Sequence, residues 1–193
     1  MTRVVVYTEL GGPEVLHLIE VADPVAGPGQ VVVQLTAVGV NPVDGKQRSG
    51  GRVLPPIVEP RRIGYDGAGV VSEVGPGVEH LQIGERVVVT ETPGTYAARL
   101  AVDAHNAVPI PREVSDEVAA AIGTPASTAY QALRSLRVRD GDTLLIHAGS
   151  GAVGQAAIQF AVDRGATVIA TSSAAHHDRM RQLSAIPVEY GPG

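Results

Sequence analysis

Short valine-rich runs separated by turn residues make up the chain as far as about residue 110. Runs of this length, rich in β-branched residues and bounded by Gly, Pro, Asn and Asp, are typical of β-strands joined by tight turns. The pattern predicts a compact, strongly bent antiparallel sheet or partial barrel. We expect strands over residues 4–10, 30–40, 67–74, 86–90 and 96–102.

A helical pattern begins at Ser115, which suits the N-cap of a helix with Asp116 and Glu117 in its first turn. Gly123 predicts the end of this helix, and a second helix fits residues 127–136. The change of pattern indicates two domains, residues 1–114 and residues 115–193.

Residues 143–148 form a near-continuous apolar run, which predicts a strand covered on both faces. His147 lies inside this run, so we expect a hydrogen-bonded core histidine and not a base. A helix that ends at Gly165 and a second strand over residues 166–171 follow. The pattern closes with a helix over residues 176–185 and a third strand over residues 187–190.

The turn after the first of these strands has the pattern G-x-G-x-x-G, within a strand, turn, helix and strand unit of about 30 residues. Glycines in such a turn let backbone N–H groups approach a pyrophosphate, and the last one lets helix and strand pack closely. The positive end of the helix dipole attracts the phosphates. The pattern predicts a dinucleotide site at Gly149, Ser150, Gly151, Ala152, Val153 and Gly154.

The residues after the second strand indicate which dinucleotide binds. An NAD site has an acidic residue roughly 20 positions after the motif, but the nearest acid, Asp178, belongs to the next predicted helix. A 2′-phosphate finds hydroxyl, imidazole and guanidinium groups there instead. NADPH is therefore favoured over NADH. Ser172 and Ser173 each also suit the N-cap of the following helix. The phosphate candidates are Ser172, Ser173, His176 and Arg179.

Composition and charge exclude several classes of protein. The chain has 193 residues, a formal net charge of −5 and no cysteine, so disulfides, thiolate zinc sites and a cysteine nucleophile are excluded. The acidic balance argues against nucleic-acid binding, and we interpret the basic clusters at residues 61–62 and 134–139 as solvated surface. No membrane span of about 20 apolar residues and no signal-peptide pattern is found, which predicts a cytoplasmic protein without membrane contacts.

Several motifs stand in the order and spacing of a known family: residues 38–44, 48–50, 64–71, 75–78, 128–133 and 141–154. They resemble the zinc-free quinone oxidoreductases, the zeta-crystallin-like branch of the medium-chain dehydrogenase/reductase superfamily. The resemblance covers essentially all of residues 1–190. It implies an α/β fold with an additional β domain: a GroES-like N-terminal domain, then a Rossmann domain of which this chain holds three strands. Cofactor and substrate are then expected between the two domains.

The resemblance also bears on the reaction. Asn41 stands where zinc-dependent relatives have cysteine, and Tyr65-Asp66 stands where they have a His-Glu pair. Without a Lewis acid, the resemblance implies hydride delivery from NADPH to a quinone or to a carbonyl-conjugated C=C bond, as in an enone or enoyl compound. The alternatives are a protein that binds NADPH without efficient turnover, in a cofactor-responsive or structural role, and an inactive fragment of the enzyme.

Further residues carry over by position. Asn41 and Thr128 are expected near the nicotinamide and its ribose, and Tyr190 near the adenosine. No residue is assigned as catalytic. The substrate-side candidates are Asn41, Lys46, Arg52 and Tyr65.

The residues at two of these positions do not decide the substrate class. Some quinone-reducing relatives have tyrosines where this chain has Lys46 and Arg52, so a polar or acidic enone, or an enoyl thioester, competes with a quinone. Alternatively, both side chains point into solvent. Asp44 resembles an acid near the cleft, but we expect it to brace the turn from Asn41 to Gly45.

The chain is shorter than the predicted fold requires. Only 39 residues (193 − 154) follow Gly154, whereas a Rossmann domain needs two mononucleotide halves. We expect either a C-terminally truncated piece of a longer protein or a short form whose open sheet edge a partner covers. Relatives usually dimerise through a part of the fold that is missing here, so a homodimer stays open. We predict that the 193-residue chain alone reduces no acceptor at an appreciable rate.

Overall fold

The computed structural model describes residues 1–51 and 55–190. The chain forms two compact units, Met1–Thr124 and Pro125–Gly193. This division falls inside the helix α2 (Asp116–Leu136), whereas the sequence pattern placed it just before that helix.

The first unit is built on a five-stranded antiparallel sheet with the strand order β7-β3-β5-β6-β8. Its core is a valine-rich cluster that includes Val31, Val33, Val71 and Val87, because alternate residues of the strands face inward. The strong bending expected from the glycine-proline turns is accompanied by register shifts between β3 and β5. The strands are β3 (Gln30–Gly39), β5 (Asp66–Val74), β6 (Arg86–Val89), β7 (Arg99–Asp103) and β8 (Ala107–Pro109).

A second, three-stranded sheet of this unit has the order β2-β1-β4. Tyr7, Val15 and Ile63 form its core. The sequence pattern predicted β1 but not β2, β4 or β8, because two of these are only two or three residues long and β2 does not alternate between exposed and buried positions. The elements are β1 (Thr2–Tyr7), β2 (His17–Val21), β4 (Arg61–Arg62), α1 (Pro42–Arg48) and the short 3₁₀ helices η1 (Pro13–Val15) and η2 (Ala104–Asn106).

The prediction of two helices over residues 115–136 is wrong, because α2 is continuous and contains Pro125. Gly123 does not end the helix. A Cβ atom at this position would lie 2.6 Å from Oδ1 of Asp66, so the glycine permits a close approach between α2 and β5. The N–H of Thr124 donates to Oδ2 of Asp66 at 3.0 Å. Contacts with a distant strand therefore outweigh the local helix-breaking signal.

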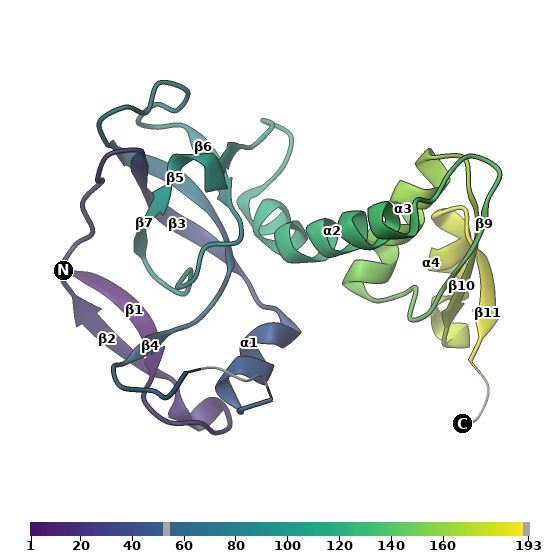
Figure 1. Cartoon of the computed structure of the whole chain (residues 1–193), viewed down its shortest axis with the longest axis horizontal. Coiled ribbons are helices and arrows are strands. Elements are labelled where there is room, and N and C mark those ends of the chain that lie inside the picture. Colours follow the sequence, from purple (N-terminus) through teal and green to yellow (C-terminus); the bar gives the residue numbers. More distant parts are fainter. Residues whose placement is uncertain (52–54, 191–193) are drawn as a thin grey trace. The chain divides into compact units, whose positions relative to one another are not determined.

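The second unit has a parallel sheet with the order β11-β10-β9, which is the predicted three-strand part of a Rossmann fold. Figure 1 shows α3 and α4 beside this sheet. Ile158, Val168 and Met180 are fully buried where the helices meet the strands. The elements are β9 (Thr143–Ile146), α3 (Ala152–Asp163), β10 (Thr167–Ser172), η3 (Ala174–His176), α4 (His177–Gln182) and β11 (Ile186–Glu189).

Only one face of β9 is covered by the described part of the chain, so the prediction of burial on both faces is wrong. Leu144 and Ile146 pack into the core, but Leu145 is 53% exposed. Leu145 pairs with Ile169, which pairs with Ile186, so the three side chains form an apolar row across the open face. His147 follows the strand and is exposed, with Nδ1 3.3 Å from Oγ1 of Thr171, and is not a core residue.

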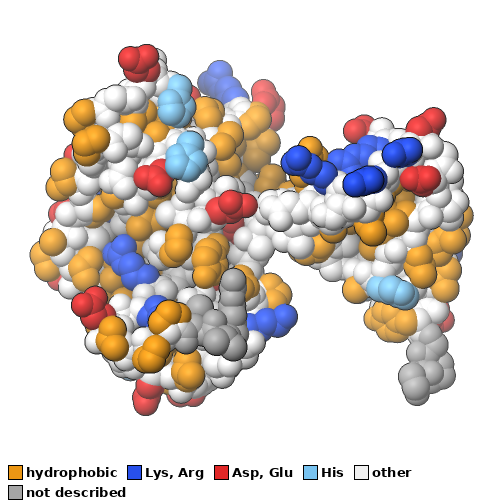
Figure 2. Space-filling model, in the orientation of Figure 1, with side chains coloured by type: hydrophobic (Ala, Val, Ile, Leu, Met, Phe, Trp, Pro, Cys, Tyr) orange, Lys and Arg blue, Asp and Glu red, His pale blue; other side chains and the backbone are white. Residues whose placement is uncertain are grey.

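The two basic clusters differ in their surroundings. Arg134, Arg137 and Arg139 are exposed, as interpreted from the sequence, and Figure 2 shows Lys and Arg side chains gathered on the second unit. The interpretation of Arg61 and Arg62 as solvated is wrong, because both are half-buried. The guanidinium of Arg61 lies 5.9 Å from the ring centre of Tyr7, and burial lowers the pKa of Arg62.

Candidate dinucleotide-binding site

The glycine turn between β9 and α3 is tied to the end of β10. The N–H of Gly149 donates to the carbonyl of Thr171 at 2.8 Å, and the N–H of Ala148 donates to Oγ1 of the same residue at 3.1 Å. The N–H of Gly151 then donates to the carbonyl of Ala148 at 3.0 Å, which closes the turn. Ala148 has a φ of 54°, in the left-handed region. These bonds hold the turn in one conformation before any ligand arrives.

The three motif glycines have different steric surroundings. A Cβ atom on Gly149 would lie 2.8 Å from Cβ of Ala170, and one on Gly154 would lie 2.7 Å from Cα of Gly149. Packing inside the chain therefore accounts for both glycines. A Cβ atom on Gly151 would make only an ordinary contact of 3.4 Å with the carbonyl of Ala148, and this residue is exposed. The described residues give no steric reason for the middle glycine.

The first turn of α3 begins at this open position. Gly151 is the N-cap, and no side chain caps the helix. The first N–H groups of an α-helix have no partner within the helix and carry partial positive charge. The first N–H groups of α3 are therefore the part of this segment that suits an anion, because the N–H groups of Gly149 and Gly151 already donate within the chain.

Gln155 connects this turn to α4, and no sequence motif points to it. Its Nε2 donates to the carbonyl of Ser150 at 2.9 Å, and its Oε1 accepts from Nε of Arg179 at 3.1 Å. Arg179 is exposed, so the bond orients its guanidinium beside the turn and leaves the terminal nitrogens available. An ordinary glutamine in a helix carries no pattern that predicts such a bridge.

The other phosphate candidates are placed unequally. Ser173 is half-buried and His176 is exposed, both after the end of β10. Ser172 is fully buried, and its hydroxyl donates to the carbonyl of Ser173 at 3.2 Å. Neither serine makes a side-chain cap on η3. Tyr190 is 56% exposed just after β11.

One substrate-side candidate of the first unit, Asn41, contacts two buried carboxylates. The side-chain Nδ2 of Asn41 donates to Oδ2 of Asp66 at 2.8 Å, and its backbone N–H donates to Oδ2 of Asp44 at 2.8 Å. The hydroxyl of Tyr96 donates to the same Asp44 oxygen at 3.1 Å. Asp44 therefore braces the start of α1, as expected, and Asn41 is fixed at both ends.

The cluster around Asn41 contains two buried carboxylates that are not fully hydrogen-bonded within the described residues. Asp44 and Asp66 are 3% and 1% exposed, and each has a buried Oδ1 without a hydrogen-bond partner among the described residues. Burial, the charge of Asp44 and the hydrogen bond to it raise the pKa of Tyr96, so this tyrosine stays a protonated donor. Sequence reasoning missed Tyr96, which is 52 positions from Asp44.

The remaining candidates are Tyr65, Lys46, Arg52 and Thr128. The hydroxyl of Tyr65 donates to Oε1 of Gln47 at 2.8 Å. Lys46 is exposed on α1, and Arg52 lies outside the described residues. Thr128 is exposed on the part of α2 that belongs to the second unit.

Within residues 1–51 and 55–190, no group of three or more His, Cys, Asp or Glu side chains is arranged to hold a metal ion, and no helix has the length and apolarity to cross a membrane.

Comparison with known proteins identifies the architecture. Residues 27–112 match the alcohol dehydrogenase GroES-like domain. The quinone oxidoreductase of Salmonella typhimurium is 38% identical over 167 residues, 86% of this chain and 50% of that protein. The structure of the quinone oxidoreductase from Coxiella burnetii has a TM-score of 0.90 at 31% identity, over 98% of this chain and 62% of that chain. For the Escherichia coli quinone oxidoreductase complexed with NADPH, the TM-score is 0.86 at 32% identity, over 98% and 58%.

The chain thus has the GroES-like domain and partial Rossmann domain of the medium-chain dehydrogenases/reductases, as the sequence predicted. Several of its relatives are quinone oxidoreductases, which confirms the resemblance given by the motifs. The chain spans about half the length of the curated relatives that it matches. This share agrees with the missing mononucleotide half that the length indicated.

Proposed function

We propose that this chain is part of an NADPH-dependent oxidoreductase that reduces a quinone or a carbonyl-conjugated C=C bond without zinc. The observation that carries the proposal is the middle glycine of the turn. Gly149 and Gly154 are required by packing, whereas Gly151 is exposed at the start of α3, and a Cβ atom there would make only an ordinary contact. A glycine that packing within the chain does not require, at a helix N-terminus, fits a pyrophosphate that must approach the backbone.

The residues present fit NADPH. The N–H groups of the first turn of α3 would hold the pyrophosphate, and Arg179, oriented by Gln155, would hold the 2′-phosphate together with Ser173 and His176. The buried Ser172 contributes to this site through its backbone position only. When bound, NADPH supplies a hydride. The Escherichia coli relative is described as complexed with NADPH, which supports this assignment.

On the substrate side, the chain provides orientation and neutral donors. Asn41 is fixed by Asp44 and Asp66. We assign Tyr65 as a donor to the oxygen on which negative charge develops, once this oxygen replaces Gln47 as the acceptor of the Tyr65 hydroxyl. The exposed position of Lys46 favours the interpretation that this side chain points into solvent, and it leaves quinones among the acceptors. A homodimer and a cytoplasmic location remain proposals from the sequence.

The cofactor assignment is tested by titration of the chain with NADPH and NADH, followed by nicotinamide fluorescence. Arg179→Gln should weaken NADPH binding about tenfold, because a charge-assisted contact to the 2′-phosphate is lost, and leave NADH binding unchanged. Arg181→Gln is the matched control, since Arg181 lies on the same helix and pairs with Asp178. Equal affinity of the unmodified chain for both dinucleotides would refute the 2′-phosphate assignment.

A second function, NADPH binding without turnover, is favoured by one observation: Lys46 stands where some quinone-reducing relatives have a tyrosine. Stopped-flow oxidation of NADPH with quinones, enones and enoyl thioesters separates the two. Oxidation by one acceptor class identifies the substrate. Tight NADPH binding with no oxidation by any of the three supports the second function for this chain.

A further inference from the structure

Arg179 is held at both ends of its side chain, although the residue is exposed. Its neighbour on α4, Met180, is fully buried in the core of the second unit. A Cβ atom on Gly149 would lie 3.1 Å from Sδ of Met180, so α4 packs directly against the glycine turn. The bond from Nε of Arg179 to Oε1 of Gln155, at 3.1 Å, then fixes the guanidinium. The backbone and the guanidinium of Arg179 are therefore both positioned relative to the turn.

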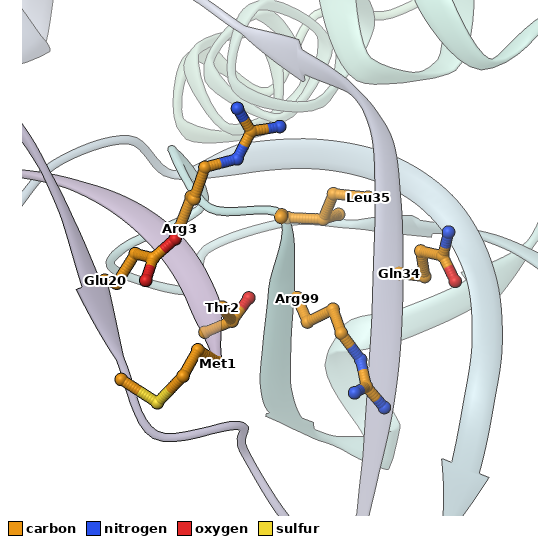
Figure 3. Close-up of a pocket in the computed structure, with 8 residues that line it drawn as sticks. Met1, Thr2, Arg3, Glu20, Gln34, Leu35 and Arg99 are labelled. Carbon is orange, nitrogen blue, oxygen red and sulfur yellow. The ribbon is translucent and has the colours of Figure 1, made fainter.

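The group that holds Arg179 is neutral, which distinguishes it from several other arginines of the chain. Arg86 and Arg181 pair with aspartates. Arg3 stands opposite Glu20 in the register of β1 and β2, and Figure 3 shows both residues beside the same cavity. Arg179 makes no ion pair with any residue of the described ranges. An amide orients the guanidinium without compensating its charge, so the full positive charge is left for an anion.

Glutamine is the residue type that the two neighbours of this side chain require. The carbonyl of Ser150 needs a donor and Nε of Arg179 needs an acceptor, and the amide of Gln155 provides both, at 2.9 and 3.1 Å. Asparagine has the same groups on a side chain that is one methylene shorter. An ionised glutamate would accept from Arg179, but it could not donate to Ser150 and would compensate the charge of the guanidinium. Because Ser150 lies inside the glycine turn, one side chain fixes the spacing between the turn and the guanidinium.

We propose that Gln155 is a specificity-determining residue of the dinucleotide site. By holding Arg179 in place, Gln155 sets the preference for NADPH over NADH, which differ only in the 2′-phosphate. It is a positioning residue, because it acts through Arg179 and needs no contact with the phosphate. The inference rests on the proposed function, since it takes the 2′-phosphate of NADPH as the group that Arg179 binds. It adds that a residue of α3, 24 positions before Arg179, decides how tightly that group is held.

The test measures the ratio of the dissociation constant for NADH to that for NADPH, by nicotinamide fluorescence. Gln155→Met keeps the length of the side chain and removes both hydrogen bonds. Arg179 must then be ordered when the phosphate binds, and immobilising a free arginine weakens affinity about two- to tenfold. We expect the ratio to fall by this factor, while the affinity for NADH changes less than twofold. Gln155→Glu keeps the acceptor but compensates the charge, so it should lower the ratio about tenfold, as Arg179→Gln does.

Gln159→Met is the matched control on the same helix. Gln159 is exposed and donates to the backbone carbonyl of Gln155 at 3.0 Å, so its replacement should leave the ratio unchanged. A double variant separates positioning from a general effect on the fold. In the Arg179→Gln background, Gln155→Met should lower the ratio no further, because its effect passes through Arg179.

The outcomes distinguish this inference from the proposed function. Equal affinity of the unmodified chain for NADPH and NADH would overturn the 2′-phosphate assignment and this inference with it. A preference for NADPH that both Gln155 variants leave unchanged would overturn this inference alone. The same holds if Gln155→Met lowers the ratio equally in the unmodified and Arg179→Gln backgrounds, because the effect would then not pass through the guanidinium.

Discussion

The substitution Gly→Ala has three different expected outcomes at three glycines of this chain, and Gly154 in the glycine turn is the most sensitive. A Cβ atom at Gly154 would lie 2.7 Å from Cα and 2.8 Å from the carbonyl oxygen of Gly149. Both are backbone atoms that the bond from Gly149 to Thr171 holds in place. Overpacking of this kind costs typically 1–3 kcal/mol, and the higher helix propensity of alanine offsets at most about 1 kcal/mol of it. We expect Gly154→Ala to lower the free energy of unfolding by about 1–2 kcal/mol.

The other two positions serve as internal controls. Gly45 lies in α1, and a Cβ atom there would meet no other atom within 4 Å, so Gly45→Ala should stabilise the chain by about 0.5–1 kcal/mol. Gly151→Ala meets only an ordinary contact and should leave stability unchanged, while it weakens NADPH binding.

Thermal unfolding is the first assay. A change of 1 kcal/mol shifts the midpoint by roughly 2–4 °C in a chain of this size, so Gly154→Ala should unfold about 2–8 °C lower. Because the chain has two compact units, amide hydrogen exchange of β10 reports on the second unit separately from β3. Wild-type stability of Gly154→Ala would show that the turn does not need its third glycine for packing.

Two further predictions concern charge and the open sheet face. Hydrogen bonds from Thr36 and Arg86 lower the pKa of Asp116. The stability that Asp116 contributes is therefore present above the usual aspartate pKa and is lost as the pH falls through the folded-state pKa. Asp116→Asn should reduce this acid limb, the loss of the free energy of unfolding that urea titrations show between about pH 5 and pH 2. An unchanged acid limb would contradict this. Leu145→Ser on the exposed face should change the free energy of unfolding by less than about 1 kcal/mol and reduce self-association in sedimentation experiments, whereas Leu144→Ser on the covered face should destabilise by about 2–4 kcal/mol. Equal destabilisation by both would show that the two faces are equally buried.

Local patterns predicted those features that depend on neighbouring residues. The valine-rich runs bounded by turn residues predicted β3, β5 and β6, and the glycine turn with its flanking strands predicted the partial Rossmann fold. Asp44 was expected to brace the turn from Asn41 to Gly45, and it does, because a residue three positions after an N-cap can reach back to the N-cap N–H. These signals are short-range and appear in the sequence itself.

Long-range contacts decided the features that local patterns predicted wrongly. Gly123 has the pattern of a helix end, but its approach to Asp66, 57 positions earlier, keeps α2 continuous. His147 has the pattern of a core residue, but the described chain covers only one face of its sheet.

The sequence by itself thus determined the class of fold and the position of the glycine turn, since both depend on the local spacing of glycines and apolar residues. Only the tertiary structure decided which groups complete the sites. The bridge from Gln155 to Arg179 and the pair of Asn41 and Asp66 join residues that are 24 and 25 positions apart. No local pattern encodes such pairings, because they arise where strands and helices pack against one another.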